Sequence, residues 1–314
     1  MNKYFIYILI FLNFALSQEI IGEGLYEEEL ISYLQNNFKT PTTLSYNNAR
    51  DILYAEVDKN TSTNQVKCIY TNYSVTLPGN VDPSTHLYEN GMNCEHLWPQ
   101  SMYEIITNNN MKSDMHHLRP CKENANSYRS NKPFNESLDN TTNNWLWLNY
   151  NYSSAPSSNI AEYSENNSSI FEPREDVKGD IARAMFYFYT IYENEADNAF
   201  FNEQKDILFD WHVADDVTQE EIIRTNLIAT YQNNIPNPFI LDSTLINRCY
   251  FNTYNLGDIN QDGYINITDI VTLVSYIVGS SNLNSSQMHL ADTNEDGFIN
   301  IIDIVQLINF ITGE

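Results

Sequence analysis

The sequence predicts an α+β fold, in which a small strand–strand–helix unit lies inside a mainly helical domain and a small all-α domain follows. Three observations support this prediction. Several stretches repeat apolar residues at helical spacing, two polar clusters at 93–101 and 112–134 are flanked by strand-like and helical patterns, and residues 255–314 contain two copies of one acidic loop. A chain of 314 residues can hold one large and one small domain.

The N-terminal residues predict a secretory signal peptide. Lys3 precedes an apolar run, and the small residues Ala15 and Ser17 form a cleavage site before Gln18. We therefore expect a signal peptide at 1–17 and domains at 18–252 and 256–314. No later stretch is apolar for about 18 residues, so we expect no membrane span and an exported protein, either secreted or periplasmic.

The first part of the mature chain predicts two helices, a strand and a loop. Apolar spacing predicts the helices over 26–38 and 47–57, and the β-branched and aromatic residues of 66–75 predict the strand. Residues 77–80 form a turn, and 81–92 are expected to be a polar loop that leads into the first polar cluster.

The second polar cluster predicts a strand over 114–118 and a helix over 122–130. On this helix Asn126 and Arg129 are spaced i, i+3, which puts them on one face. The Asn- and Ser-rich segment 135–167 is expected to be a surface excursion with one buried strand. Three further helices are expected over 176–192, 206–211 and 218–232, the last of which begins with a capping box.

The four cysteines predict one or two disulfides, because their number is even and the chain carries an export signal. They are Cys68, Cys94, Cys121 and Cys249. Cys94 and Cys121 flank the two polar clusters, so a bridge between them would join the two clusters. Buried free thiols are the alternative.

The net charge of −25 excludes a protein that binds nucleic acid by bulk electrostatic attraction. The local charge is different between residues 111 and 132, where five basic residues face only two acids, Asp114 and Glu123, giving 5 − 2 = +3. The basic residues are Lys112, Arg119, Lys122, Arg129 and Lys132. This stretch is either a phosphate-binding surface or an ordinary solvated face.

The two acidic repeats predict two calcium sites. They start 34 residues apart, and each has oxygen-bearing residues at loop positions 1, 3, 5, 7, 9 and 12 with glycine at position 6, the ligand spacing of an EF-hand loop. The first set is Asp258, Asn260, Asp262, Tyr264 (through its carbonyl), Asn266 and Asp269. The second set is Asp292, Asn294, Asp296, Phe298 (through its carbonyl), Asn300 and Asp303.

This C-terminal pattern resembles type I dockerin modules. The resemblance covers about 256 to 313 and implies a calcium-stabilised module that docks onto a cohesin or another scaffold partner at the surface. The residues before position 12 are Ile267-Thr268 and Ile301-Ile302, whereas Ser/Thr pairs often mark cohesin recognition. A calcium-dependent anchoring or spacer module is therefore the basic prediction.

The polar clusters have the residue types that metal-assisted phosphodiester hydrolysis needs. Glu95 lies beside His96, so that a carboxylate could bind a hard cation while a histidine takes a proton from water. The guanidinium groups of Arg119 and Arg129 could meet phosphate charge. A zinc site built from His96, His116 and Cys121 is the competing chemistry, although it lacks the usual ligand spacing.

The motifs NCEHLWPQS, SDMHHLRP, NANSYRSNKPF and NPFI occur in an order that resembles the secreted bacterial endonuclease I family. The resemblance covers about 25 to 250 and implies a ββα-metal active site. It implies that His96 is the general base, and that Glu95 and Asn126 hold a single Mg²⁺. Arg119 or Arg129 would take the place of a phosphate-binding arginine that some members carry between His96 and Asp114.

We therefore expect an exported, Mg²⁺-dependent endonuclease of low sequence specificity, which acts on DNA, with RNA as a second candidate substrate, and leaves 5′-phosphate ends. His116 and His117 are expected to be structural, and Asp114 to orient His96 or to cap a turn. The alternative function is a non-catalytic, calcium-dependent attachment or scaffold protein with a degenerate nuclease domain. The sequence leaves the oligomeric state, the docking partner and the natural substrate open.

Overall fold

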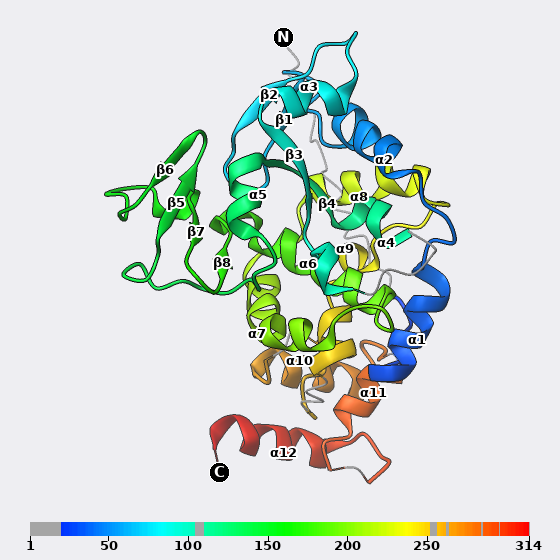
Figure 1. Ribbon diagram of the computed structural model, residues 1–314. Coiled ribbons are helices and arrows are strands. Elements are labelled where there is room, and N and C mark those ends of the chain that lie inside the picture. Colours follow the sequence, from blue (N-terminus) through cyan, green and yellow to red (C-terminus); the bar gives the residue numbers. More distant parts are fainter. Residues whose placement is uncertain are drawn as a thin grey trace, which may run out of the picture.

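The computed structural model describes residues 20–103, 110–251, 256–261, 264–283, 285–294 and 296–313 (Figure 1). Helices and strands are mixed along the larger part of the chain, which confirms the α+β class. Among the described residues, no helix combines the length and the apolar character that a membrane span requires. The predicted signal peptide lies outside the described residues.

Helix α6 (Lys178–Ile191) is the centre of the main hydrophobic core. Of its 14 residues, all but Asp180 are buried, which explains why apolar residues occur on every side of the helix. It packs against α1 (Glu27–Phe38), α7 (Asn198–Ala214) and α9 (Pro238–Leu241). The helix predicted over 176–192 is therefore present.

Strands β3 (Met92–His96) and β4 (Leu118–Lys122) form an antiparallel pair, and α5 (Glu123–Arg129) follows β4 directly and contacts both strands. The register places Glu95 opposite Arg119. Just after β3, Trp98 stacks on Phe188 of α6 with ring centroids 5.2 Å apart. This contact ties the end of β3 to the central helix.

Two predictions near the N-terminus are wrong. The strand expected over 66–75 is a hairpin of β1 (Gln65–Lys67) and β2 (Ser74–Thr76), because the chain turns at Asn72, whose φ is +57°. The loop expected over 81–92 contains helix α3 (Pro83–Glu89), whose first turn is capped by the Asp82 carboxylate accepting from Thr85 N–H at 2.8 Å.

The other elements between residues 46 and 117 are short. The second predicted helix consists of α2 (Tyr46–Ile52) and a π-helical turn at Leu53–Val57. A 3₁₀ turn at Gln100–Met102 and helix α4 (Asn110–Ser113) follow β3. The strand expected over 114–118 is instead a 3₁₀ turn at Met115–His117, and β4 begins only at Leu118.

The segment expected to be a surface excursion with one strand forms a four-stranded antiparallel sheet. Its strands are β5 (Asn144–Trp147), β6 (Tyr150–Tyr152), β7 (Ser164–Asn166) and β8 (Phe171–Glu172), in the order β6-β5-β7-β8. Figure 1 shows this sheet projecting from the body, beside α5. Two 3₁₀ turns complete the region, at Ile160–Glu162 and Glu175–Val177.

The helices after α6 follow the predictions in place and differ in length. Helix α7 starts earlier than the predicted 206–211, because the Asp197 carboxylate caps it by accepting from Phe200 N–H. Helix α8 (Gln219–Tyr231) has the predicted capping box between Thr218 and Glu221. A π-helical turn at Asn247–Phe251 ends this part of the chain.

The C-terminal helices have a separate small core. Helices α10 (Ile267–Ile277) and α12 (Ile301–Thr312) pack on each other, with α11 (Ser285–Ala291) between them in sequence. The buried residues of this core are Ile259, Leu273, Leu283, Ala291 and Leu307. The predicted boundary between 252 and 256 falls on residues that the structure does not describe.

The predicted disulfides are absent, and the four cysteines are buried free thiols. Cys121 lies beside Cys68, with the two sulfur atoms 3.9 Å apart, and not beside Cys94 as the sequence suggested. The Lys122 N–H donates to Cys68 Sγ at 3.1 Å. The register of β3 and β4 explains the difference, because Cys121 lies opposite Asn93, so Cys94 points to the other face of the strand pair.

Candidate active site

Glu95 is a buried carboxylate near the end of β3, and only 2% of its surface is exposed. Its Oε1 accepts a hydrogen bond from Tyr70 Oη at 2.8 Å and lies 3.6 Å from Arg129 Nε. Burial raises the pKa of Glu95 to about 7, although Arg129 and Tyr70 act in the opposite direction. Both of these contacts use Oε1, so Oε2 is the oxygen available for a cation.

Asn126 lies on the same side of β3 as Glu95. Its amide nitrogen donates to Asn93 Oδ1 at 2.9 Å and to the Cys94 carbonyl at 3.2 Å. Asn93 and Glu95 are two residues apart on a strand and therefore share a face. With the nitrogen held by β3, the Asn126 Oδ1 is free to act as a ligand. One carboxylate and one amide oxygen fit a hard cation such as Mg²⁺, with waters completing its shell.

His96 is the last residue of β3, and its neutral ring is held in one tautomer. Nε2 lies 3.1 Å from the Lys112 carbonyl, which can only accept, so Nε2 carries the proton and Nδ1 has the lone pair. The Gln100 amide nitrogen donates to Nδ1 at 3.4 Å, a long hydrogen bond. Burial, followed by the charges of His117, Lys112 and Arg50, lowers the pKa of His96 to about 3, although the hydrogen bond to the Lys112 carbonyl acts in the opposite direction. The ring is therefore neutral at pH 7.

Arg50 and Lys112 lie beside His96, and the sequence alone did not point to Arg50 as a residue of the site. The Tyr46 ring stacks on the His96 ring with centroids 5.3 Å apart. The Arg50 guanidinium and the Lys112 ammonium lie 4.8 and 4.9 Å from the Tyr46 centroid. Within the described ranges, neither cation is in an ion pair with an acid. The only sequence signal was the i, i+4 spacing of Tyr46 and Arg50.

Arg129 is fully buried, and both of its terminal nitrogens donate within the protein. Nη2 donates to the Leu97 carbonyl at 2.6 Å and Nη1 to the Ser130 carbonyl at 3.0 Å. Its guanidinium also lies over the Phe134 ring at 4.6 Å. This placement indicates that Arg129 positions Glu95 and the end of β3, in place of the phosphate contact that the sequence suggested.

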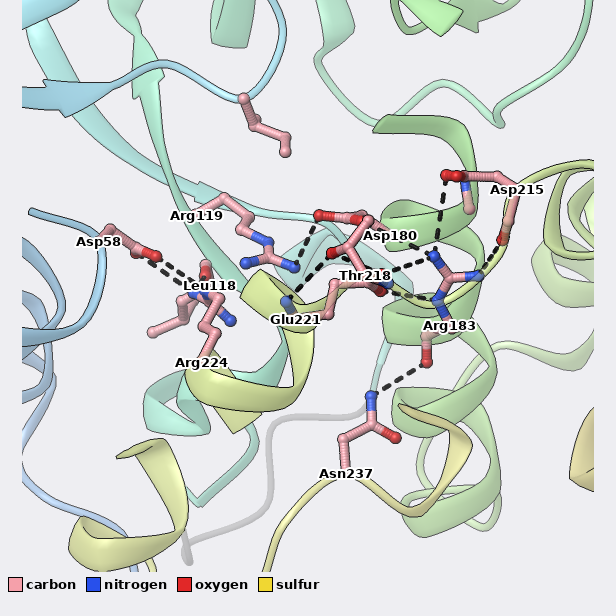
Figure 2. Close-up of polar contacts among 12 residues, drawn as sticks. Asp58, Leu118, Arg119, Asp180, Arg183, Asp215, Thr218, Glu221, Arg224 and Asn237 are labelled. Carbon is pink, nitrogen blue, oxygen red and sulfur yellow. Dashed lines mark hydrogen bonds and ion pairs between the residues drawn. The ribbon is translucent and has the colours of Figure 1, made fainter. Parts of the chain in front are cut away.

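Arg119 belongs to a buried network of ion pairs between β4, α6 and α8 (Figure 2). Its Nη2 lies 3.7 Å from Asp180, and burial together with Arg224 lowers its pKa to about 10. Arg224 pairs with Asp58 at 2.7 Å and also donates to the Leu118 carbonyl at 2.8 Å. This placement indicates that Arg119 anchors β4 to the helices instead of contacting phosphate.

Arg183 of α6 completes the network shown in Figure 2. It forms two hydrogen bonds to the Glu221 carboxylate, at 2.7 and 2.9 Å, and donates to the Asp215 carbonyl at 2.7 Å. Two parallel hydrogen bonds fix the angle between the two side chains as well as their distance. The network therefore joins α6 to the start of α8, and β4 rests on both.

Asp114 is fully buried and is the acceptor of four hydrogen bonds. They come from Tyr187 Oη at 2.9 Å, Tyr192 Oη at 2.8 Å, Gln232 Nε2 at 2.9 Å and His116 N–H at 3.0 Å. Burial acts to raise the pKa of Asp114, but His116, His117 and these donors outweigh it and lower the pKa. Asp114 thus caps the turn that carries the two histidines, and does not contact His96.

His116 and His117 are structural, as the sequence suggested. His116 Nε2 lies 3.0 Å from the Ile235 carbonyl, and His117 Nε2 lies 2.7 Å from the Met111 carbonyl.

Across the described residues, the predicted zinc ligands are not brought together. The only acidic or sulfur cluster there with metal-like spacing is Glu136, Glu172 and Glu175. The Lys178 ammonium bonds all three at 2.7–2.8 Å, so this cluster already has its cation.

The two C-terminal loops have matching hydrogen bonds. The position-12 carboxylates of Asp269 and Asp303 accept from the backbone N–H of Asn260 and Asn294, at 3.0 and 3.4 Å. In the second loop, Asp292 accepts from the N–H of Asp296 at 3.1 Å and of Gly297 at 2.8 Å, where φ is +85°.

Convergent side-chain oxygens around such a turn fit a Ca²⁺ ion. Asp258 is buried at the start of the first loop, and the capping boxes of Asn266 and Asn300 begin the helices that follow. The predicted ligand Asp262 lies outside the described residues.

Comparison with known proteins gives two family matches and two relatives. The family model of endonuclease I matches residues 27–244, and that of the dockerin type I domain matches residues 256–312. An extracellular ribonuclease of Bacillus subtilis (strain 168) is 30% identical over 236 residues, covering 70% of this chain and 73% of that protein. An extracellular ribonuclease of Bacillus amyloliquefaciens is 33% identical over 162 residues, or 47% of this chain and 50% of that protein.

The buried histidines predict that acid destabilises the larger part of the protein. Burial lowers the folded-state pKa of His117 to about 4, below its unfolded value of about 6.5, so the unfolded chain binds more protons between these values. The free energy of unfolding should therefore fall as the pH drops from about 6.5 toward 4.

His117→Gln should reduce this pH dependence by about one proton, whereas His86→Gln on α3 should leave it unchanged. Urea unfolding at pH 7, 6 and 5, followed by tryptophan fluorescence, measures it, since all four tryptophans precede residue 252. Equal slopes for wild type and His117→Gln would contradict the argument.

Proposed function

The chain belongs to the endonuclease I family and carries a C-terminal dockerin type I module, and from this premise we propose that it is an exported, Mg²⁺-dependent endonuclease. It hydrolyses DNA and RNA with little sequence specificity and leaves 5′-phosphate ends. The observation that carries the proposal is the neutral His96, with Nδ1 as its unprotonated nitrogen, at the end of the strand that also carries Glu95. The relatives named extracellular ribonucleases support RNA as a substrate and export as the destination.

In the proposed reaction His96 is the general base. Its Nδ1 takes a proton from the attacking water, and the Lys112 carbonyl strengthens its hydrogen bond to Nε2–H as the ring becomes cationic. Attack at phosphorus releases the 3′ oxygen, so the phosphate stays on the 5′ end. Glu95 and Asn126 would hold the single Mg²⁺ of a ββα-metal site. When bound, this ion supplies positive charge that stabilises the charge developing on the phosphate and the leaving oxygen.

Arg50 and Lys112 are the proposed phosphate-binding residues. Both are half-buried, both contact the Tyr46 ring that stacks on His96, and neither has an acidic partner among the described residues. Arg119 and Arg129 are proposed to be positioning residues, since they are buried and hold β4 and Glu95. Among the described residues the site has no base-reading element, so the proposed contacts are to the backbone and specificity is low.

The C-terminal module is proposed to bind two Ca²⁺ ions and to attach the enzyme to a cohesin-type scaffold. Its two repeats expose the same apolar positions on α10 and α12. Ile267 and Ile301 are 70% and 67% exposed, and Val271 and Val305 are 59% and 51% exposed. Exposed apolar residues of this kind mark a protein–protein contact.

His96→Ala should abolish nicking of supercoiled plasmid by the mature protein, because loss of a general base reduces the rate by roughly 10²–10⁴. Wild type should cut with Mg²⁺ in low salt and stop in EDTA, and His86→Ala should cut normally. Equal cutting by His96→Ala would contradict the mechanism. A wild-type protein that is inert on both DNA and RNA, and still folds its module with calcium, would favour attachment as the main function.

Arg50→Ala and Lys112→Ala should each lower kcat/KM about tenfold or more, since each removes a charge-assisted phosphate contact. The salt dependence of log(kcat/KM) should also become shallower, because fewer counterions are released on binding. Lys205→Ala on α7 is the matched control and should change neither. Kinetics on a labelled oligonucleotide at several salt concentrations measures both effects, and an unchanged slope would refute phosphate contact.

Calcium should bind the full-length protein with a stoichiometry of two, and Asp269→Ala should reduce it to one. The reason is that Asp269 supplies the position-12 carboxylate of the first loop, whereas Gln306→Ala on α12 removes no ligand. Titration calorimetry measures the stoichiometry. Removing calcium with EGTA in excess Mg²⁺ should lower the helical circular dichroism and spare cleavage. An unchanged stoichiometry in Asp269→Ala would contradict the site.

A further inference from the structure

The β5–β6 hairpin has two chemically different faces. Leu146 faces the main hydrophobic core, whereas Trp145 and Trp147 pair across the strands with Tyr152 and Tyr150 and therefore lie on the other face. Tyr163, just before β7, contacts Trp145, Trp147 and Tyr152. We call these five side chains the aromatic face.

Three rings of the aromatic face, those of Trp147, Tyr150 and Tyr152, are stacked in succession, and the two tyrosines are open to solvent. Trp147 and Tyr150 are 6.3 Å apart with an interplanar angle of 26°, and Tyr150 and Tyr152 are 5.7 Å apart at 18°. Tyr150 and Tyr152 are 52% and 41% exposed on the edge strand β6. The Trp145 Nε1 is buried without an acceptor among the described residues.

Structural packing alone does not explain this exposure. The sheet is already attached to the body through Leu146 and through two backbone anchors. Leu148 N–H donates to the Thr71 carbonyl at 2.6 Å, and Ser164 Oγ donates to the Tyr70 carbonyl at 2.7 Å. Tyrosines needed only for packing would be covered by the rest of the sheet. Here the whole of β6 is exposed, including both tyrosines.

Two lysines without acidic partners in the described part of the chain hold the sheet next to the active site. Lys122, at the end of β4, donates to Asn149 in the β5–β6 turn, and Lys132 donates to the Asn167 carbonyl at 2.7 Å. Asn151 of β6 donates to Tyr128 Oη of α5 at 2.7 Å. The hairpin therefore abuts the helix that carries Asn126, and positive charge lies between the two.

We infer that the aromatic face binds unpaired bases of single-stranded nucleic acid that extends from the active site. This inference rests on the proposed function and specifies its substrate. Every base has a π face, so stacking on exposed tyrosines is independent of sequence, and Lys122 and Lys132 meet the phosphates at the junction. Bases inside a duplex are stacked on each other and are not available. The enzyme therefore prefers long single strands to duplexes.

The test measures binding, so that it does not depend on cleavage. The full chain carrying His96→Ala is titrated into a labelled 20-nucleotide single strand, its duplex and a 4-nucleotide strand, and fluorescence anisotropy is followed. Tyr150→Ala with Tyr152→Ala should weaken binding of the long single strand at least about fivefold. Binding of the duplex and of the short strand should stay within about twofold. Tyr88→Ala, at an exposed tyrosine on α3, should change nothing.

Two further variants and one competitor complete the test. Tyr150→Phe with Tyr152→Phe keeps the rings and should bind as the parent does, which separates lost stacking from a misfolded hairpin. Unchanged affinity of the alanine variant for the long single strand, or an equal loss for the duplex, would overturn the inference. A different result would be that the protein needs the two tyrosines to be retarded by a soluble polysaccharide in a gel, while their replacement leaves oligonucleotide binding unchanged. That result would assign the aromatic face to sugar binding. An inactive wild-type enzyme that still binds single strands through these tyrosines would refute the nuclease function alone.

Discussion

The arrangement of the candidate active site depends on the buried carboxylate of Asp114. A charge without water around it is stable only when donors replace the water, and four donors from α6, from the end of α8 and from the chain itself do so here. These bonds fix the turn between α4 and β4. The same short segment offers the Lys112 carbonyl to His96 and the Met111 carbonyl to His117. The tautomer of His96 therefore depends on the Asp114 carboxylate, which fixes this segment without contacting His96.

The second constraint is the aromatic helix α6, which holds both ends of the site. Phe188 stacks under Trp98 just beyond β3, and Tyr187 and Tyr192 donate to Asp114. Arg183 of the same helix fixes α8, on which β4 rests (Figure 2). Since aromatic rings and paired hydrogen bonds allow few alternative arrangements, β3 and β4 are held as rigidly as the core itself.

Local patterns in the sequence were enough to predict much of the fold, but they could not predict contacts between distant segments. Helices α1, α5, α6 and α8 followed from spacing and caps, and the residues of β3 and α5 that face the proposed metal were found by motif. Helix α3 was missed although Asp82 and Pro83 signal its start, because polar composition was given more weight than the cap. Arg50 was missed, and Arg129 was given a surface role, because only tertiary packing brings the first to Tyr46 and buries the second. The predicted pairing of Cys94 with Cys121 is wrong for the same reason, because sequence order does not show which residues lie next to Cys121.

Eight of the fifteen described Lys and Arg residues of this acidic chain form an ion pair with an acid, and four of the other seven (Arg50, Lys112, Lys122 and Lys132) lie at the site and beside the projecting sheet. A polyanion is therefore repelled by the net charge of the molecule and attracted locally by these four cations. At low ionic strength the repulsion acts on strands within about a Debye length of the rest of the surface, whereas strands that approach these four cations meet the candidate site. Approaches toward the candidate site are thus favoured before the strand contacts the protein. Moderate salt then has two opposing effects on association, because it relaxes the general repulsion while it weakens the local attraction.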